Sequence, residues 1–222
     1  LTCSPALLAD LNTGLVGFWK FDEGAATNVA LDSGPNELNG TISGSPGRVA
    51  GVSNGAFHFD GNDDRVVIPN HTALQMGSYT VSLWMHPEQN DEQWTGLFGR
   101  GNPRTHTIWL GNSNSPTGGF IHHRFKEGAE VNSGVDDISL FGWDKWFHFV
   151  ATNQDQGGMA KVFLNGSMVK SHMMTDSLGI NTTAPLNIGV NPEDVSSNSM
   201  YYLGMLDEVR IYDRALSSSE VT

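Results

Sequence analysis

The segment Gly204-Met-Leu-Asp-Glu-Val-Arg-Ile-Tyr-Asp-Arg-Ala-Leu216 near the end of the chain decides the fold. Its first part, together with Tyr202 and Leu203 before it, is rich in the β-branched, aromatic and aliphatic residues that favour strands. An acidic residue, Asp207, lies inside this run, and a short polar exit follows Tyr212. We expect a strand over Tyr202–Tyr212 that carries Asp207.

The composition favours an all-β protein. The chain has 222 residues, of which 16% are charged and 26 are glycine, and its aromatic residues are spread along its length. This composition is typical of many short strands joined by turns. Two-sheet β domains often reach about 200–250 residues as a single unit, so we expect one domain.

The charge of the chain limits the classes of ligand that it could bind. A net charge of -12 with only 12 basic residues leaves no Lys/Arg cluster that could neutralise a run of phosphates. We therefore expect neither nucleic acid nor an anionic membrane as a partner. No apolar run approaches the roughly 20 residues that span a bilayer. The single cysteine, Cys3, excludes an internal disulfide.

Alternation with period 2 marks the strands. In Tyr79–His86, Val81, Leu83 and Met85 alternate with Thr80, Ser82 and Trp84. No helical pattern is sustained, and residues 25–56, rich in Gly, Asn, Ser and Pro, are expected to form a long loop across one rim. About a dozen strands are expected, as two packed antiparallel sheets require. Besides Tyr79–His86 and Tyr202–Tyr212 they are Leu15–Phe21, Ala56–Phe59, Arg65–Ile68, Thr95–Arg100, Thr105–Gly111, Phe120–Phe125, Trp146–Asn153, Ala160–Asn165, Ser167–His172 and Pro185–Val190.

Three further motifs occur ahead of Gly204–Leu216. They are Gly17-Phe-Trp-Lys-Phe-Asp-Glu-Gly24, Phe59-Asp-Gly-Asn-Asp-Asp64 and Trp146-Phe-His-Phe-Val-Ala-Thr152. Together, and in this order, the four motifs resemble the laminin-G-like, concanavalin A-type jelly roll over almost the whole chain. The resemblance implies a two-sheet antiparallel β-sandwich over residues 14–222, preceded by a lead-in over residues 1–13. It also implies a domain that binds glycans or proteins outside cells.

A structural calcium ion is part of what the resemblance implies. In the related jelly-roll glycan hydrolases, the acidic residue ahead of the Val-Arg-Ile-Tyr-like run often ligates calcium, which makes Asp207 the first candidate and Asp22 the second. Asp32 and Asp60 are further candidates because they lie in turns, where the chain can curl around a hard cation. The alternative is that these aspartates only bond the backbone of their own turns.

Tryptophan side chains suggest where a sugar could bind, because a flat aromatic face stacks on the C–H groups of a sugar ring. Trp19 and Trp146 belong to the family motifs and Trp84 lies on the expected strand Tyr79–His86; all three are expected in the core. Trp94, Trp109 and Trp143 belong to none of these motifs.

Two neighbouring strands could present a sugar-binding patch. If Ile108, Leu110, Ile121 and Phe125 face the core, Trp109 faces away from it, and so do His122 and Arg124. We expect these three residues to bind a glycan, with Arg100 and Trp94 at the edge of the patch. The alternative is that Trp109 packs under a rim loop and His122 is an ordinary surface residue, and a shift of the register by one residue would reverse the faces. Arg124 could also recognise a carboxylate or sulfate group on a polysaccharide.

The sequence lacks the signatures of jelly-roll enzymes. It has neither the Glu-x-Asp-x-x-Glu strand of the related hydrolases nor the Gln-Ile-His strand of the alginate lyases. The adjacent residues His122 and His123 would point to opposite faces of a strand, which argues against zinc there. Two close carboxylates, or a Tyr–His–Arg cluster in a groove, would favour a hydrolase or a lyase instead.

The sequence therefore predicts a non-catalytic carbohydrate-binding module with a structural calcium ion. We expect a monomeric module, part of a longer extracellular chain, that tethers a larger secreted protein to a neutral, acidic or sulfated polysaccharide. An adhesion or protein-interaction domain is the alternative.

Overall fold

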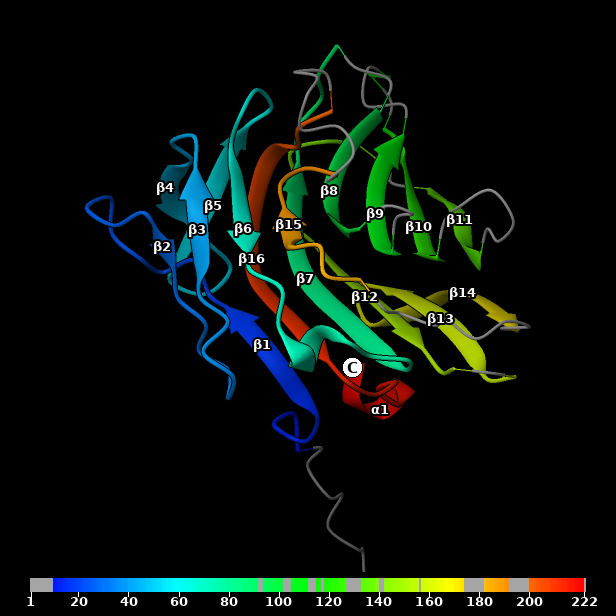
Figure 1. Ribbon diagram of the computed structural model, residues 1–222. Coiled ribbons are helices and arrows are strands. Elements are labelled where there is room, and N and C mark those ends of the chain that lie inside the picture. Colours follow the sequence, from blue (N-terminus) through cyan, green and yellow to red (C-terminus); the bar gives the residue numbers. More distant parts are fainter. Residues whose placement is uncertain are drawn as a thin grey trace, which may run out of the picture.

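The computed structural model describes residues 10–91, 94–101, 105–111, 115–116, 118–126, 133–139, 142–155, 157–173, 182–191 and 200–221. They form two antiparallel sheets packed face to face (Figure 1), which confirms the predicted all-β sandwich.

Sheet A contains the central strands of the fold. Across the sheet, its order is β14 (Ser167–Met173), β13 (Met159–Leu164), β12 (Phe147–Asn153), β7 (Tyr79–Pro87), β16 (Leu203–Tyr212), β5 (Gly55–Asp60) and β4 (Gly47–Ala50), with β1 (Leu15–Trp19) also paired to β16.

Sheet B lies against it. Its order is β11 (Ser133–Ser139), β10 (Phe120–Lys126), β9 (Thr105–Gly111), β8 (Trp94–Arg100), β15 (Leu186–Ile188), β6 (Arg65–Ile68), β3 (Gly40–Ser43) and β2 (Val29–Ala30). Two short helices complete the described elements, the 3-10 helix η1 (Thr72–Leu74) and α1 (Ser218–Val221).

The core lies between the sheets and follows the alternation read from the sequence. On β7, Val81, Leu83 and Met85 are buried in the main hydrophobic cluster, as predicted. Thr80, Ser82 and Trp84 point to the other side of sheet A, away from sheet B, because successive side chains of a strand alternate. We call that side the outer face of sheet A.

Trp19 joins the first strand to the segment that crosses to sheet B. Its side chain is fully buried, as predicted, and its indole Nε1 donates a hydrogen bond to the carbonyl oxygen of Leu38 at 2.9 Å. The predicted strand extends to Phe21, but β1 ends at Trp19. Phe21 has φ 56°, and this left-handed conformation is incompatible with continued strand pairing.

The expectation of a long loop over residues 25–56 is wrong. The segment contains β2, β3 and β4, of which the first two extend sheet B and the third extends sheet A. These strands have two to four residues each, too few for a period to show in the sequence. Tertiary contacts stabilise them: the Arg48 guanidinium on β4, for example, lies 3.9 Å from the ring centroid of Phe57.

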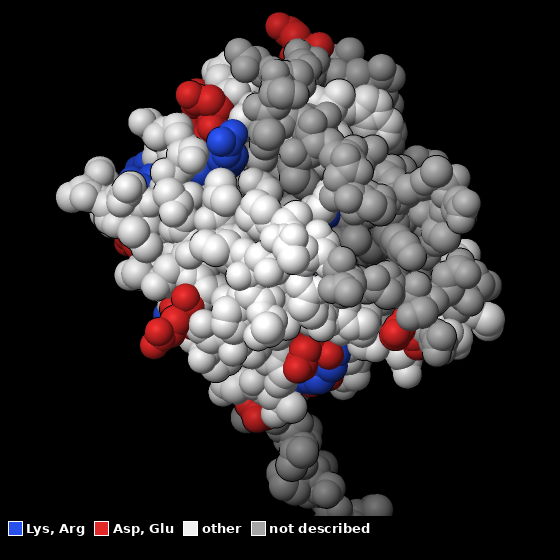
Figure 2. All heavy atoms as spheres, viewed as in Figure 1, with Lys and Arg blue, Asp and Glu red and all other residues white. Residues whose placement is uncertain are grey.

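A second, smaller hydrophobic cluster covers one end of the outer face of sheet A. Leu216 and Val221, from α1 and the turn before it, pack there with Val150, Phe163 and Tyr212. Figure 1 shows α1 at the lower edge of the sandwich, beside the ends of β7 and β16. The described part of the face shown in Figure 2 is largely uncharged, with acidic groups spaced around its rim.

Trp19→Phe tests the importance of the Trp19 contact. The substitution removes the hydrogen bond to Leu38 and leaves a small cavity, so we expect a loss of about 2–3 kcal/mol in the free energy of unfolding. Chemical denaturation monitored by circular dichroism measures this loss. Met173→Ala, at a side chain that is 62% exposed, serves as the control and should change stability by less than about 0.5 kcal/mol.

Candidate functional site

The structure pairs the two strands of the predicted sugar-binding patch but buries its central residue. Trp109 pairs with His122 across β9 and β10, and Ile108 and Leu110 face the core as predicted. Trp109 nevertheless has only 5% of its surface exposed. Trp94, which is half-buried, packs edge-on against it, with ring centroids 6.4 Å apart and planes at 88°. The expectation that Trp109 offers an open ring face is therefore wrong, because its side of the sheet is also covered.

Arg100 is a second correction. Its side chain is 1% exposed, and its guanidinium donates to the carbonyl oxygens of Leu74 (2.6 Å), Ala184 (3.0 Å) and Thr182 (3.0 Å) and to the side chain of Asn70 (2.5 Å). Burial lowers the pKa of Arg100 from its usual value. Arg100 thus holds η1 and the segment before β15 to sheet B, and no hydrogen-bonding edge of it is free for a ligand.

The other predicted patch residues remain predictions. The structure gives the strand register of His122 and Arg124, which pair with Trp109 and Thr107, but their side chains lie outside the described part of the chain. Trp143, which also lies outside the family motifs, is buried, and its Nε1 donates to the carbonyl oxygen of Ser115 at 2.6 Å.

The outer face of sheet A carries aromatic rings that the sequence assigned to the core. Trp84 and Trp146 are half-buried there rather than fully buried, which corrects the prediction for both. The Trp84 ring stacks on the imidazole of His148, with centroids 5.0 Å apart and planes at 22°. Trp146 contacts His86 edge-on at 5.4 Å. Both ring pairs lie where β7 and β12 run side by side.

Polar side chains accompany these rings. His148 Nε2 and the Ser82 hydroxyl are 3.0 Å apart and share a hydrogen bond. Burial, with a smaller effect from the positive charge of Arg210, lowers the pKa of His148, so its imidazole is neutral at neutral pH. Arg210 is ion-paired with Glu208, and its guanidinium lies 3.8 Å from the ring centroid of Phe18.

Strand register puts these groups in adjacent rows. Arg210 on β16 pairs with Phe18 on β1 and with Ser82 on β7. Trp84 on β7 pairs with His148 on β12. Residues directly opposite each other in an antiparallel pair project from the same face. Flat aromatic surface and planar polar groups thus alternate over a few strands, which is the chemistry that recognises a sugar ring and its hydroxyls.

The signal for Trp84 was present in the sequence. The alternation over Tyr79–His86 sets Trp84 opposite Val81, Leu83 and Met85, and those three residues do face the core. The large apolar ring of Trp84 on a strand favoured burial, and the period-2 pattern pointed to the outer face.

Asp207 lies on the same face, next to Trp84 in the register, but a loop covers it. Its side chain is fully buried, and its Oδ2 accepts a hydrogen bond from the Ser53 backbone N–H at 2.9 Å. Gly51 allows this close approach, because a Cβ there would lie 2.5 Å from Asp207 Oδ2. Asp207 Oδ1 is buried and accepts no hydrogen bond of normal geometry. Burial raises the pKa of Asp207 to about 6.

Asp22 contacts the same loop. Its Oδ1 accepts a hydrogen bond from the Gly55 N–H at 2.8 Å. The two leading calcium candidates, Asp207 and Asp22, are therefore brought to one short loop over residues 51–55. An orphaned, buried carboxylate oxygen is what a bound hard cation would satisfy, so these residues fit calcium.

Asp32 and Asp60 do not join that loop. Asp32 accepts hydrogen bonds from the backbone N–H groups of Phe18, Gly34 and Leu38 at 2.7–2.8 Å and thereby anchors β1 to the following turn. Asp60 lies at the opposite end of β5 from Gly55, and its Oδ1 accepts from the Asn62 N–H at 2.9 Å. Both aspartates bond the backbone of turns, which was the alternative for them. One ligand atom each from Asp60, Asp63 and Asp64 lies within 4.8 Å of the others, and the assignment of Asp32 and Asp60 as ligands stays a prediction.

A comparison with family models identifies the fold family. A model described as the concanavalin A-like lectin/glucanases superfamily matches residues 60–222. The chain belongs to this superfamily. The predicted laminin-G-like resemblance is thereby confirmed. A comparison with curated protein sequences found no significant match.

Several solved structures resemble the chain over nearly its whole length. Domain 4 of AbnA, a GH43 extracellular arabinanase from Geobacillus stearothermophilus, was solved in complex with arabinotriose. It is 26% identical to this chain, and the match covers 94% of this chain and 96% of that domain with a TM-score of 0.67.

Toxin binding domains share the fold at lower identity. The binding domain of Paraclostridial Mosquitocidal Protein 1 is 18% identical, with a TM-score of 0.74 over 96% of this chain and 52% of that one. The binding domain of Botulinum Neurotoxin DC, solved in complex with SialylT, is 12% identical, with a TM-score of 0.73 over 96% and 51%. The chain spans about half the length of these toxin domains. Among the described residues, none of the helices has the length and apolar character that crossing a bilayer requires.

Arg100→Met distinguishes a structural role of Arg100 from a ligand-binding role. The substitution strands several buried carbonyl oxygens, and we expect it to lower the free energy of unfolding by about 2–4 kcal/mol. Urea denaturation measures this loss. Unchanged stability accompanied by weaker ligand binding would contradict the structural assignment.

Asp207→Asn tests the buried carboxylate. The folded-state pKa of about 6 lies above the ordinary 3.8, so between these values the folded protein holds more protons than the unfolded chain. In EDTA, wild-type stability should therefore fall as pH rises from 4 to 7, by about 2–3 kcal/mol from this group, and the variant should lack that part of the fall.

Calcium should change the melting temperatures of the wild type and of Asp207→Asn differently. Millimolar calcium at pH 7.5 should raise the melting temperature of the wild type and leave that of Asp207→Asn unchanged, because the ion compensates the buried charge. Equal calcium responses in the two proteins would contradict Asp207 as a ligand.

Proposed function

We propose that this domain is a non-catalytic carbohydrate-binding module whose ligand lies on the outer face of sheet A. The observation that carries the proposal is the half-buried Trp84, stacked on His148 and flanked by Ser82 and Arg210. A sugar ring can lie against the aromatic surface while the planar side chains bond its hydroxyls.

Three properties of these residues suit a sugar site. Trp84 and His148 are held by their contact with each other, so little side-chain freedom is lost on binding. His148 is neutral because of its lowered pKa and can donate to a hydroxyl or accept from one. Arg210 is fixed over Phe18 and paired with Glu208, so it offers N–H donors in a defined plane.

The comparison with the arabinanase domain supports a glycan ligand. That domain covers nearly the same length as this chain, and its structure was solved in complex with arabinotriose. A neutral arabinose-containing polysaccharide is therefore the first ligand to test, ahead of the acidic or sulfated glycans that Arg124 suggested. An extracellular role, tethering a larger protein to its polysaccharide, follows as part of the proposal.

Calcium would have a structural role in this proposal. Asp207 and Asp22 would hold the ion and fix the loop over residues 51–55, which lies on the outer face beside Trp84. Removal of calcium should therefore weaken glycan binding indirectly, by loosening this loop.

Affinity electrophoresis across arabinan and across neutral, uronic and sulfated polysaccharides tests the proposal, with calorimetry on arabinotriose for the affinity. Trp84→Ala should weaken binding by roughly tenfold or more through the loss of stacking. Trp94→Ala is the matched control, since it removes another half-buried tryptophan, on sheet B, and should leave the affinity unchanged.

The reverse result, with loss in Trp94→Ala only, would move the site to the strands of His122 and Arg124. Failure of the wild type to bind any polysaccharide with calcium present would contradict the proposal and favour the adhesion alternative. Release of new reducing ends from a bound polysaccharide would contradict its non-catalytic part.

A further inference from the structure

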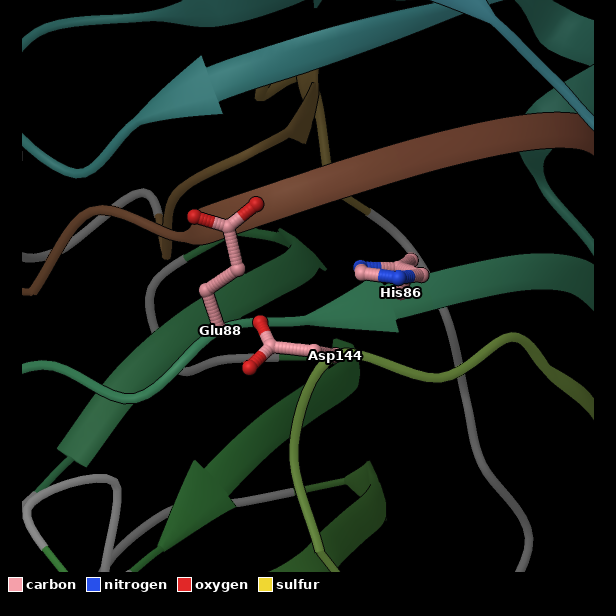
Figure 3. A group of neighbouring side chains, drawn as sticks. All are labelled: His86, Glu88 and Asp144. Carbon is pink, nitrogen blue, oxygen red and sulfur yellow. The ribbon is translucent and has the colours of Figure 1, made fainter.

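Three potential metal ligands meet at the end of β7. One ligand atom from each of His86, Glu88 and Asp144 lies within 4.8 Å of the others. Figure 3 shows His86 on the strand, Glu88 just beyond its end and Asp144 on the segment that leads to β12. His86 and Glu88 are two residues apart on extended backbone and so share a face. The Asp144 backbone N–H donates to the carbonyl oxygen of Pro87 at 3.0 Å, which ties the two segments together.

His86 supplies an independent observation. Its Nδ1 atom is buried and has no hydrogen-bond partner, and its ring packs edge-on against Trp146 at 5.4 Å. A buried nitrogen without a partner is destabilising, because it has lost its bonds to water. Coordination of a cation by this nitrogen would supply the missing partner.

Glu88 is already oriented by a neighbour. His58 Nε2 lies 3.0 Å from Glu88 Oε1, and both side chains are only partly exposed. This bond leaves the second carboxylate oxygen of Glu88 for another ligand. Hydrogen bonding of a ligating carboxylate by an outer residue is the usual second layer of a metal site.

We propose that His86, Glu88 and Asp144 form a binding site for a divalent first-row transition ion such as zinc. One imidazole nitrogen with two carboxylates suits zinc, whereas calcium takes oxygen ligands only. Tetrahedral ligands at about 2.1 Å lie about 3.4 Å apart, so the three atoms, which lie within 4.8 Å of one another, must close in by at most about 1.4 Å. Asp144 is exposed and can rotate to do so, and water completes the coordination from the solvent side.

This site is separate from the Asp207 loop and differs from it in chemistry. A bound ion would join the end of β7 to the segment before β12 and would fix Trp146 through His86. It does not depend on the proposed glycan ligand.

Calorimetric titration of the EDTA-stripped, dialysed chain with zinc chloride tests the proposal. We expect one high-affinity zinc ion per chain, and a rise in melting temperature with zinc that magnesium does not produce. Asp144→Asn should lower the zinc affinity by about tenfold or more. Asparagine tolerates the left-handed backbone of position 144, where φ is 58°, so the fold should persist.

Two further variants complete the test. His86→Gln should lose zinc affinity to a similar extent, and His172→Gln, at an exposed histidine on β14, should not. Unchanged zinc binding in both Asp144→Asn and His86→Gln would overturn the site. So would preferential binding of calcium over zinc at this cluster in the Asp207→Asn background, in which the other site is removed.

Discussion

The pairing of β7 with β16 is the interaction on which the rest of the structure depends. β16 also pairs with β1 and β5, and β7 with β12, so the two strands join both halves of sheet A. Leu206, Val209 and Ile211 of β16 all face the core, although Leu206 and Val209 are three residues apart. A regular strand cannot place both inward. The register therefore shifts between Asp207 and Arg210, and Glu208 adopts φ 53°. This irregularity acts as a β-bulge, because it accommodates one extra residue and restores the alternation of the side chains.

The bulge also arranges the outer face. It leaves Asp207 opposite Trp84 and Arg210 opposite Ser82, so the acidic residue and the guanidinium both lie on the side away from sheet B. The two ends of this face are then used differently. α1 and Tyr212 close one end with apolar packing, and the loop over residues 51–55 covers Asp207. The aromatic and polar groups between them remain partly exposed, which is where a ligand can reach them.

Burial accounts for the main errors in predicting the site. The alternation of β9 placed Trp109 away from the core correctly, but alternation says nothing about what covers the other face of a sheet. Arg100 was expected at the edge of the sugar-binding patch, whereas its side chain is almost fully buried. Four acceptors contributed by residues 70, 74, 182 and 184 compensate its burial, and only the tertiary structure brings them together. Likewise, β2, β3 and β4 are too short for a recognisable period and form only because longer strands pair with them.

The sequence by itself determined the class of fold, most of the long strands and the core side of β7. These features are encoded locally, in period-2 alternation and in motifs of a few residues. Only the tertiary structure decided which aromatic rings stay accessible, that Arg100 is internal, and that His86 and Glu88 meet Asp144 from a segment far along the chain. The physical reason is that exposure and ligand geometry depend on the elements packed above a strand, and the local pattern of the strand does not contain them.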